Sequence, residues 1–170
     1  AVLPKEGRYN LYLDFVPLGA IEQQIGLSLQ TQSYSHDSPP SEAADANLQK
    51  NFGGYDVELS FDTPLKSAQM SAGASRLKFE ISKDGQPAAA LKPYLGSFGH
   101  LVMINTKTYE YTHVHPVQKG QLKPDQNGGP IVEFMPMSIY SPVKPGIYRL
   151  FGQFNPDGNL ITADFTVEVL

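Results

Sequence analysis

Three of the four histidines in this chain of 170 residues fall within one short window, at His100, His113 and His115. His113 and His115 are separated by one residue, so on a β-strand their side chains project from the same face. If residues 105–108 form the turn of a hairpin, His100 lies directly opposite His113 on the neighbouring strand, and cross-strand partners share a face. The spacing therefore predicts that three imidazoles converge on one face of a hairpin.

The same register places Val102, Ile104, Tyr109 and Tyr111 on this face, with Tyr111 opposite Val102. These side chains would give the imidazoles an apolar and aromatic floor. A slip of one residue would send His100 to the other face, so the inference depends on the turn. Neutral imidazole nitrogens are ligands for copper and zinc, and three of them with one open position satisfy either metal.

Two methionines bear on the choice of metal. Met135 and Met137 project alike if their strand continues past Pro136, and thioether with imidazole is a ligand combination for copper, Cu(I) in particular, rather than for zinc. Core packing is the alternative role for both. The three histidines also have an alternative role, in which they cap a sheet end or join a hydrogen-bond network without metal. The remaining histidine, His36, lies in a polar stretch and is expected to be solvated.

Strands must position these residues, and the sequence from Gly54 onward has the pattern of strands. Short runs with alternating polarity recur, each bounded by Gly, Pro, Asn or Asp. The expected strands are approximately 55–62, 75–82, 99–105, 108–115, 130–135, 146–154 and 161–169. This number and rhythm predict an all-β fold, an immunoglobulin-like or cupredoxin-like seven-stranded β-sandwich. Tyr148, four residues after Lys144, fits the tyrosine corner of such folds.

The first thirty residues repeat part of this pattern. Residues 7–19 match residues 146–158 without a gap at six of thirteen positions, including the Gly, Tyr and Pro residues that shape a hairpin. We therefore predict an N-terminal hairpin at 1–30 that resembles strands F and G of an upstream repeat, a polar linker at 31–53 with one or two helical turns at most between 42 and 50, and the sandwich at 54–170. Common hairpin chemistry is the alternative source of the match.

A lone two-stranded hairpin is marginally stable in water. Residues 1–30 are therefore expected to pack on the sandwich, to pair with a second chain, or to be the remnant of an upstream domain. We expect docking on a sheet edge, within one chain or by exchange in a homodimer.

Composition excludes several functions. The net charge of −4 is too small to attract nucleic acid or an anionic membrane, and no apolar stretch approaches the roughly 18 residues of a membrane span. The chain has no cysteine, which rules out disulfides, thiol catalysis and metal sites that need a thiolate. It also lacks a Gly-x-Ser-x-Gly elbow, a P-loop and a Gly-x-Gly-x-x-Gly motif, so we expect no catalysis.

Several segments together resemble a family. They are LKPYLGSFGHLV at 91–102, YTHVHP at 111–116, VEF at 132–134, PGIYRLFGQF at 145–154 and ADFTV at 163–167. In these segments the chain is similar to exported bacterial β-sandwich proteins of unassigned function related to the YtkA-like group, with Ser97 where a small Ala is expected. The resemblance implies export to the periplasm or the medium, two similar domains in succession, and often a heavy-metal context, but no reaction.

Two functions follow as hypotheses. The first is an exported, non-catalytic protein that binds a metal ion, copper or alternatively zinc, through His100, His113 and His115. The second is a structural or protein-interaction module whose histidines only support the hairpin and bind no metal.

Overall fold

The computed structural model describes residues 3, 5–15, 17–19, 23–32, 42–61, 64–117, 122–123, 125–136 and 142–170. The chain divides into two compact units, Ala1–Pro40 and Ser41–Leu170, and each is described by itself. His36, Met137 and residues 33–41 of the expected linker lie outside the described residues. Within the described part of the chain, no helix has the length and apolar character needed to cross a membrane.

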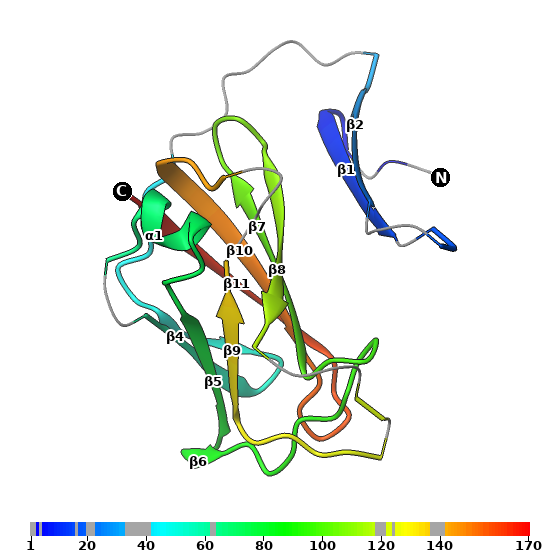
Figure 1. Cartoon of the computed structure of the whole chain (residues 1–170). Coiled ribbons are helices and arrows are strands. Elements are labelled where there is room, and N and C mark those ends of the chain that lie inside the picture. Colours follow the sequence, from blue (N-terminus) through cyan, green and yellow to red (C-terminus); the bar gives the residue numbers. More distant parts are fainter. Residues whose placement is uncertain are drawn as a thin grey trace. The chain divides into compact units, whose positions relative to one another are not determined.

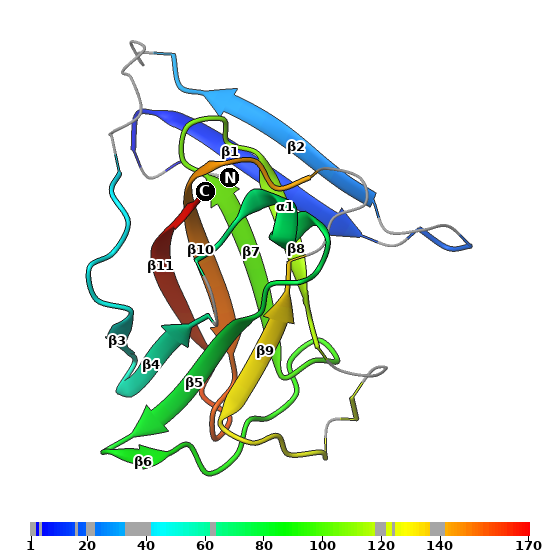
Figure 2. The same ribbon diagram turned by 60° about the vertical axis from the view of Figure 1, so that its left-hand side comes forward.

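The second unit is a β-sandwich of antiparallel strands (Figures 1 and 2). The strands form one continuous hydrogen-bonded path, β11-β10-β7-β8-β9-β5-β4-β3, with β6 paired to β5. The path folds into two layers, β11-β10-β7-β8 and β9-β5-β4-β3, which are joined where β8 pairs with β9. All seven strands expected from the sequence are present, and the all-β prediction is confirmed. The strands are β3 (Gln49–Phe52), β4 (Tyr55–Ser60), β5 (Leu77–Lys83), β6 (Gln86–Pro87), β7 (Gly99–Asn105), β8 (Tyr111–Pro116), β9 (Ile131–Met135), β10 (Gly146–Phe154) and β11 (Ile161–Val169).

The neighbour relations are those of an immunoglobulin-like sandwich. The order β4-β5-β9 corresponds to strands A, B and E, and β11-β10-β7 to G, F and C, with β8 added beside C. The expected tyrosine corner is present, because the Tyr148 hydroxyl donates a hydrogen bond to the Lys144 carbonyl oxygen at 2.9 Å. The Lys144 N–H in turn donates to the Tyr148 oxygen at 3.1 Å, which fixes the chain where it enters β10.

Four phenylalanines hold the two layers together. Phe79 lies at the centre, with ring centroids 5.6 Å from Phe134, 5.2 Å from Phe154 and 6.0 Å from Phe165. All four are fully buried. Aromatic pairs at these separations add about 0.5–1.5 kcal/mol each beyond the burial of their area. This cluster is the core onto which the inner faces of β7 and β10 pack.

The sandwich begins earlier than the sequence predicted. β3 lies within the stretch expected to be a linker and pairs with β4, with Phe52 opposite Tyr55. Residues 42–48 form no helix, which is within the expected limit of one or two helical turns. β3 carries the sequence Gln-Lys-Asn-Phe, which has one apolar residue and no clear alternation, and therefore gave no strand signal. A five-residue helix, α1 (Ser67–Ser71), was also not expected.

The edge strands β3 and β11 are brought together by polar contacts. The Lys50 ammonium donates to the Asp45 carboxylate at 2.6 Å and to the Asp164 carbonyl oxygen at 3.2 Å. The Asp45 N–H donates to the Thr166 carbonyl oxygen, and the Thr166 N–H donates to the Asp45 carboxylate. These contacts satisfy backbone groups that would otherwise leave β11 an open edge.

The first unit contains the predicted hairpin, formed by β1 (Arg8–Phe15) and β2 (Gln23–Gln30). The two strands pair antiparallel, with Tyr9 opposite Leu29. Docking of this hairpin on a sheet edge stays a prediction.

Candidate metal site

The three histidines lie on the outer face of the β7–β8 hairpin, as their spacing predicted. In β7, Leu101 and Met103 are fully buried, while His100 and Val102 alternate with them and are half-buried. In β8, His113 is half-buried and His115 is exposed. The intervening residues therefore point into the core of the sandwich, and the imidazoles lie on the face that is turned towards solvent.

The predicted register of this hairpin is wrong by two residues. His113 lies opposite Val102, not His100, and Tyr111 lies opposite Ile104, not Val102. The turn comprises residues 106–109 rather than 105–108, because the Asn105 N–H donates to the Glu110 carbonyl oxygen and closes a four-residue loop that lies one position further along the chain.

Tyr109 and Asn105 shape this loop. Tyr109 adopts a left-handed φ of 59° and therefore belongs to the loop, not to the floor of the histidine face. The Asn105 side-chain oxygen accepts hydrogen bonds from the backbone N–H groups of Lys107 and Thr108. Because the error is an even number of residues, all three histidines keep the predicted face.

The imidazoles make contacts of their own on this face. The rings of His113 and His115 stack with centroids 4.8 Å apart and planes inclined by 30°. His100 Nε2 lies 2.7 Å from the Tyr94 carbonyl oxygen, and the His100 ring meets the Tyr94 ring edge-on at 5.8 Å. A carbonyl oxygen only accepts, so Nε2 carries the proton and Nδ1 is the nitrogen of neutral His100 that has a lone pair for a ligand.

Strand pairing explains why the three rings do not converge. The ladder between β7 and β8 ends at Leu101 and Val114, one residue short of His100 and His115. Beyond it β8 pairs with β9, through His115 with Met135 and Pro116 with Phe134. Among the residues that the structure describes, no three His, Cys, Asp or Glu side chains form a group that could hold a metal ion.

Met135 is the additional side chain that this pairing brings to the histidine face. It lies directly opposite His115 and is half-buried, whereas its neighbour Phe134 points into the core. Direct cross-strand partners have Cβ atoms about 4.5–5.5 Å apart. A thioether and an imidazole therefore lie side by side on the outer face. Met70 and Met103 are fully buried in the core.

An ion pair lies at the tip of the hairpin. The Lys144 ammonium bonds to the Glu110 carboxylate. This bond, opposed by partial desolvation and helped by the Thr108 hydroxyl and the Lys144 charge, lowers the pKa of Glu110 from its ordinary value. The same bond and the charge of Glu110 raise the pKa of Lys144. The pair ties the loop of the hairpin to the tyrosine corner before β10.

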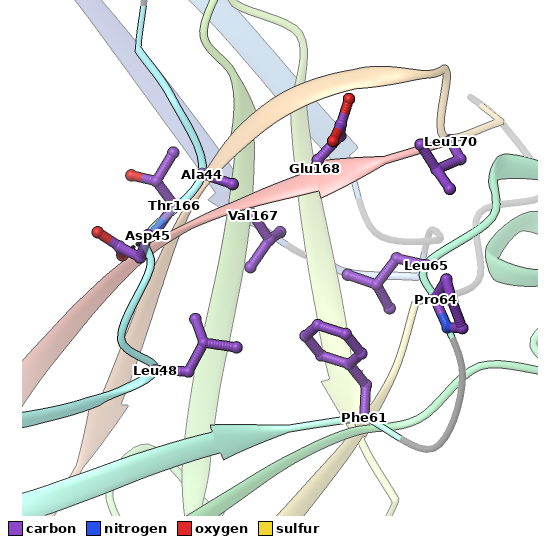
Figure 3. Close-up of a pocket in the computed structure, with 10 residues that line it drawn as sticks. All are labelled: Ala44, Asp45, Leu48, Phe61, Pro64, Leu65, Thr166, Val167, Glu168 and Leu170. Atoms are coloured by element: carbon purple, nitrogen blue, oxygen red, sulfur yellow. Dashed lines mark hydrogen bonds between the residues drawn. The ribbon is translucent and has the colours of Figure 1, made fainter.

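A groove of about 420 Å³ lies elsewhere, lined by residues between 44 and 48, by Phe61, Pro64 and Leu65, and by the end of β11. Leu48, Phe61 and Val167 point into it, while the Glu168 carboxylate points away (Figure 3). Burial of the Asp45 carboxyl raises its pKa, but hydrogen bonds from Lys50 and from the Thr166 N–H outweigh this, so the net pKa lies below 3.8. Asp45 is thus already hydrogen-bonded, and the described residues that line this groove include no histidine.

Comparison with known proteins places the chain in a family. Residues 49–170 match the family described as "Domain of unknown function (DUF8832)", and the chain belongs to this family. The match begins at Gln49, the first residue of β3, in agreement with the earlier start of the sandwich. Comparison with curated proteins gave no match, nor did comparison with solved structures. The resemblance to the YtkA-like group stays a prediction.

Proposed function

We propose that this protein is a non-catalytic metal-binding β-sandwich that takes up one copper ion on the outer face of β7 and β8, with His100, His113 and His115 as ligands. The observation that carries the proposal is the pairing of His115 with Met135 next to the stacked His113 ring. His113 and His115 are two residues apart on β8, and Met135 of β9 lies opposite His115. Two imidazoles and a thioether therefore occupy adjoining positions on one face of the sheet.

Binding requires side-chain rotations that bring the imidazoles together. Stacked rings 4.8 Å apart point their nitrogens in similar directions, whereas one metal needs both nitrogens within about 2.0–2.1 Å of itself. His115 is exposed, so its χ angles turn without disturbing the core. His100 contributes Nδ1 while its Nε2 keeps the bond to the Tyr94 carbonyl oxygen, in the way that metal-bound histidines often retain a second hydrogen bond.

The proposal favours copper over zinc. Thioether ligands suit Cu(I), and zinc makes little use of them. Replacement of Met135 by Leu keeps the volume of the side chain and removes the sulfur. We expect Met135→Leu to weaken Cu(I) binding about tenfold or more and to leave Zn(II) binding within about twofold. Equal losses for both metals would contradict a role for the thioether.

Calorimetric titration of the full chain with Cu(I), Cu(II) and Zn(II) tests the proposal. We expect one equivalent of copper to bind, His113→Ala to weaken binding at least about tenfold, and His36→Ala, the matched histidine control, to change it little. Binding should also weaken as the pH falls from about 7.5 to 5.5, since protons compete for ligating imidazoles. Equal affinities of the wild type and His113→Ala would reject the site.

A structural role without metal is the second candidate. The bond between His100 and the Tyr94 carbonyl oxygen favours it, because that bond ties β7 to the loop before it. In that case His100→Ala lowers the free energy of unfolding by about 1 kcal/mol and no metal binds at one equivalent. Export to the periplasm or the medium also remains our proposal, and fractionation of cells that express the full gene would test it.

A further inference from the structure

The N-terminal hairpin carries an apolar face that the described residues of its own unit do not cover. Six side chains on one face of β1 and β2 are each between 42% and 54% exposed. They are Leu11, Leu13, Phe15, Ile25, Leu27 and Leu29. Exposed apolar patches of this kind mark interaction surfaces, and a lone hairpin gains little stability by itself.

The hairpin of β10 and β11 has the same construction. Tyr9 forms a tyrosine corner like that of Tyr148: its hydroxyl donates to the Lys5 carbonyl oxygen at 2.6 Å, and the Lys5 N–H donates back at 3.1 Å. Leu11 faces Leu27 across the strands, as Leu150 faces Phe165.

The remaining pairs correspond once the longer loop of the first hairpin is allowed for. Tyr9 faces Leu29 as Tyr148 faces Val167, and Leu13 faces Ile25 as Gly152 faces Ala163. The counterparts of the six exposed side chains are all buried in the core of the second unit. They are Leu150, Gly152, Phe154, Ala163, Phe165 and Val167. In that unit the face is the interface with the layer of β4, β5 and β9.

We propose that the hairpin is the F–G hairpin of a second sandwich of the same kind, and that its apolar face packs on the A–B–E layer of that sandwich, supplied by chain preceding residue 1. The spacing between the two hairpins would start that layer roughly 90 residues before residue 1. This inference is independent of the metal site.

Side-chain volume argues against a second copy of the same unit as the partner. In the second unit, Gly152 lies against two aromatic rings: a Cβ built there would be only 2.8 Å from Phe154 and, at 3.5 Å, already in van der Waals contact with Phe79. The first hairpin has Leu13 at the position of Gly152 and Ile25 at that of Ala163. If β1–β2 replaced β10–β11 of another copy, the atoms of Leu13 beyond its Cβ would crowd the Phe79 ring, and Ile25 would add volume at a position that is fully buried as Ala163. The partner layer should therefore carry a smaller residue where this unit has Phe79.

Amide hydrogen exchange on two chains tests the proposal: residues 1–170, and the longer natural chain that includes the residues encoded before residue 1. We expect the amides of 9–15 and 23–29 to exchange at least about 100-fold more slowly in the longer chain, and those of 148–154 to be unchanged. No slowing would overturn the proposal. Slow exchange of these amides in residues 1–170 that disappears on dilution would overturn the proposal and show that a second copy of the chain covers the apolar face. Slow exchange in residues 1–170 at every dilution would overturn it and show that the same chain covers the face.

Two variants of the longer chain complete the test. Leu27→Asp places a carboxylate on the apolar face, and Asn10→Asp places one on the opposite face, where it still accepts the hydrogen bond from Ser28. We expect Leu27→Asp to abolish the slowing and Asn10→Asp to preserve it. If both variants or neither abolished it, the apolar face would not be the contact surface. The comparison of the two wild-type chains decides the matter even if Leu27→Asp fails to fold.

Discussion

The inner and outer faces of the β7–β8 hairpin are built from alternate residues of the same two strands. On the inner face Leu101, Met103 and Val114 are fully buried against the phenylalanine core. On the outer face His100 and His113 are half-buried and His115 is exposed. The inner face contributes to the free energy of folding, while the outer face presents the imidazoles for which we propose metal binding. Substitutions on the two faces should therefore separate stability from binding.

The largest effect is expected from Leu101→Ala on the inner face. Removal of a fully buried leucine leaves a cavity and should lower the free energy of unfolding by about 2–5 kcal/mol. Val102→Ala, its half-buried neighbour on the outer face, should cost less than about 1 kcal/mol. Urea unfolding of both variants measures the difference. Similar losses in the free energy of unfolding would mean that the inner and outer faces contribute equally to stability, contrary to this account.

Gly99→Ala should have the next largest effect. A Cβ at Gly99 would lie 2.9 Å from the Phe154 ring and 3.0 Å from the Phe134 ring, so the aromatic core must shift. We expect a loss of about 1–3 kcal/mol in thermal or urea unfolding. Gly129→Ala is the matched control, since nothing lies within 4 Å of its added Cβ. A loss as large at Gly129 would contradict the packing argument.

Asp45→Asn tests whether stability and metal binding are separate, because it removes a charge at the contact between β3 and β11, away from the histidine face. The lowered pKa of Asp45 means that its ionised form stabilises the folded state above pH 3.8, and that this contribution is lost as the pH falls through the lowered value. The variant should be less stable by about 1–2 kcal/mol at pH 7, and the difference should shrink as the pH falls below 3.8. Copper affinity at pH 7 should not change. A pH-independent difference would contradict the assignment.

Glu110→Gln should have the smallest effect. The pKa of Glu110 is lowered, so the contribution of its charge to stability is present above pH 4.5 and fades as the pH falls below it. The Glu110–Lys144 pair is largely exposed, and such pairs contribute little and are screened by salt. We expect a barely measurable drop in the unfolding midpoint at low salt and none at about 1 M salt. A large, salt-independent drop would show that the pair holds the hairpin tip.

Strands with a clear alternation of polarity, such as Ala163, Phe165 and Val167 in β11, could be located from the sequence because one of their faces is buried. The Tyr148 corner could be predicted because its hydrogen bonds are local and depend on spacing alone. β3 could not, since it has one apolar residue and no clear alternation of polarity, and since its contacts with β11 are made by residues far apart in the sequence, such as Lys50 with the Asp164 carbonyl oxygen.

The histidine face shows the same limit. The face of each side chain follows from the period of two residues, so it was predicted correctly. The register was not, because it depends on the left-handed residue Tyr109 and on the Asn105 side chain that caps the loop. The pairing of Met135 with His115 depends on where β8 leaves β7 and joins β9. The point at which β8 changes its pairing partner from β7 to β9 depends on the packing of the whole sandwich, and the sequence of one strand does not specify it.

The most direct test of the central claim is the nuclear magnetic resonance spectrum of the histidine ring nitrogens while Cu(I), which is diamagnetic, is added to the full chain. We predict that the ring nitrogens of His100, His113 and His115 shift together and stop shifting at one equivalent, while those of His36 stay in place. Unchanged signals of His113 and His115 at one equivalent would contradict the claim that the outer face of this hairpin binds copper.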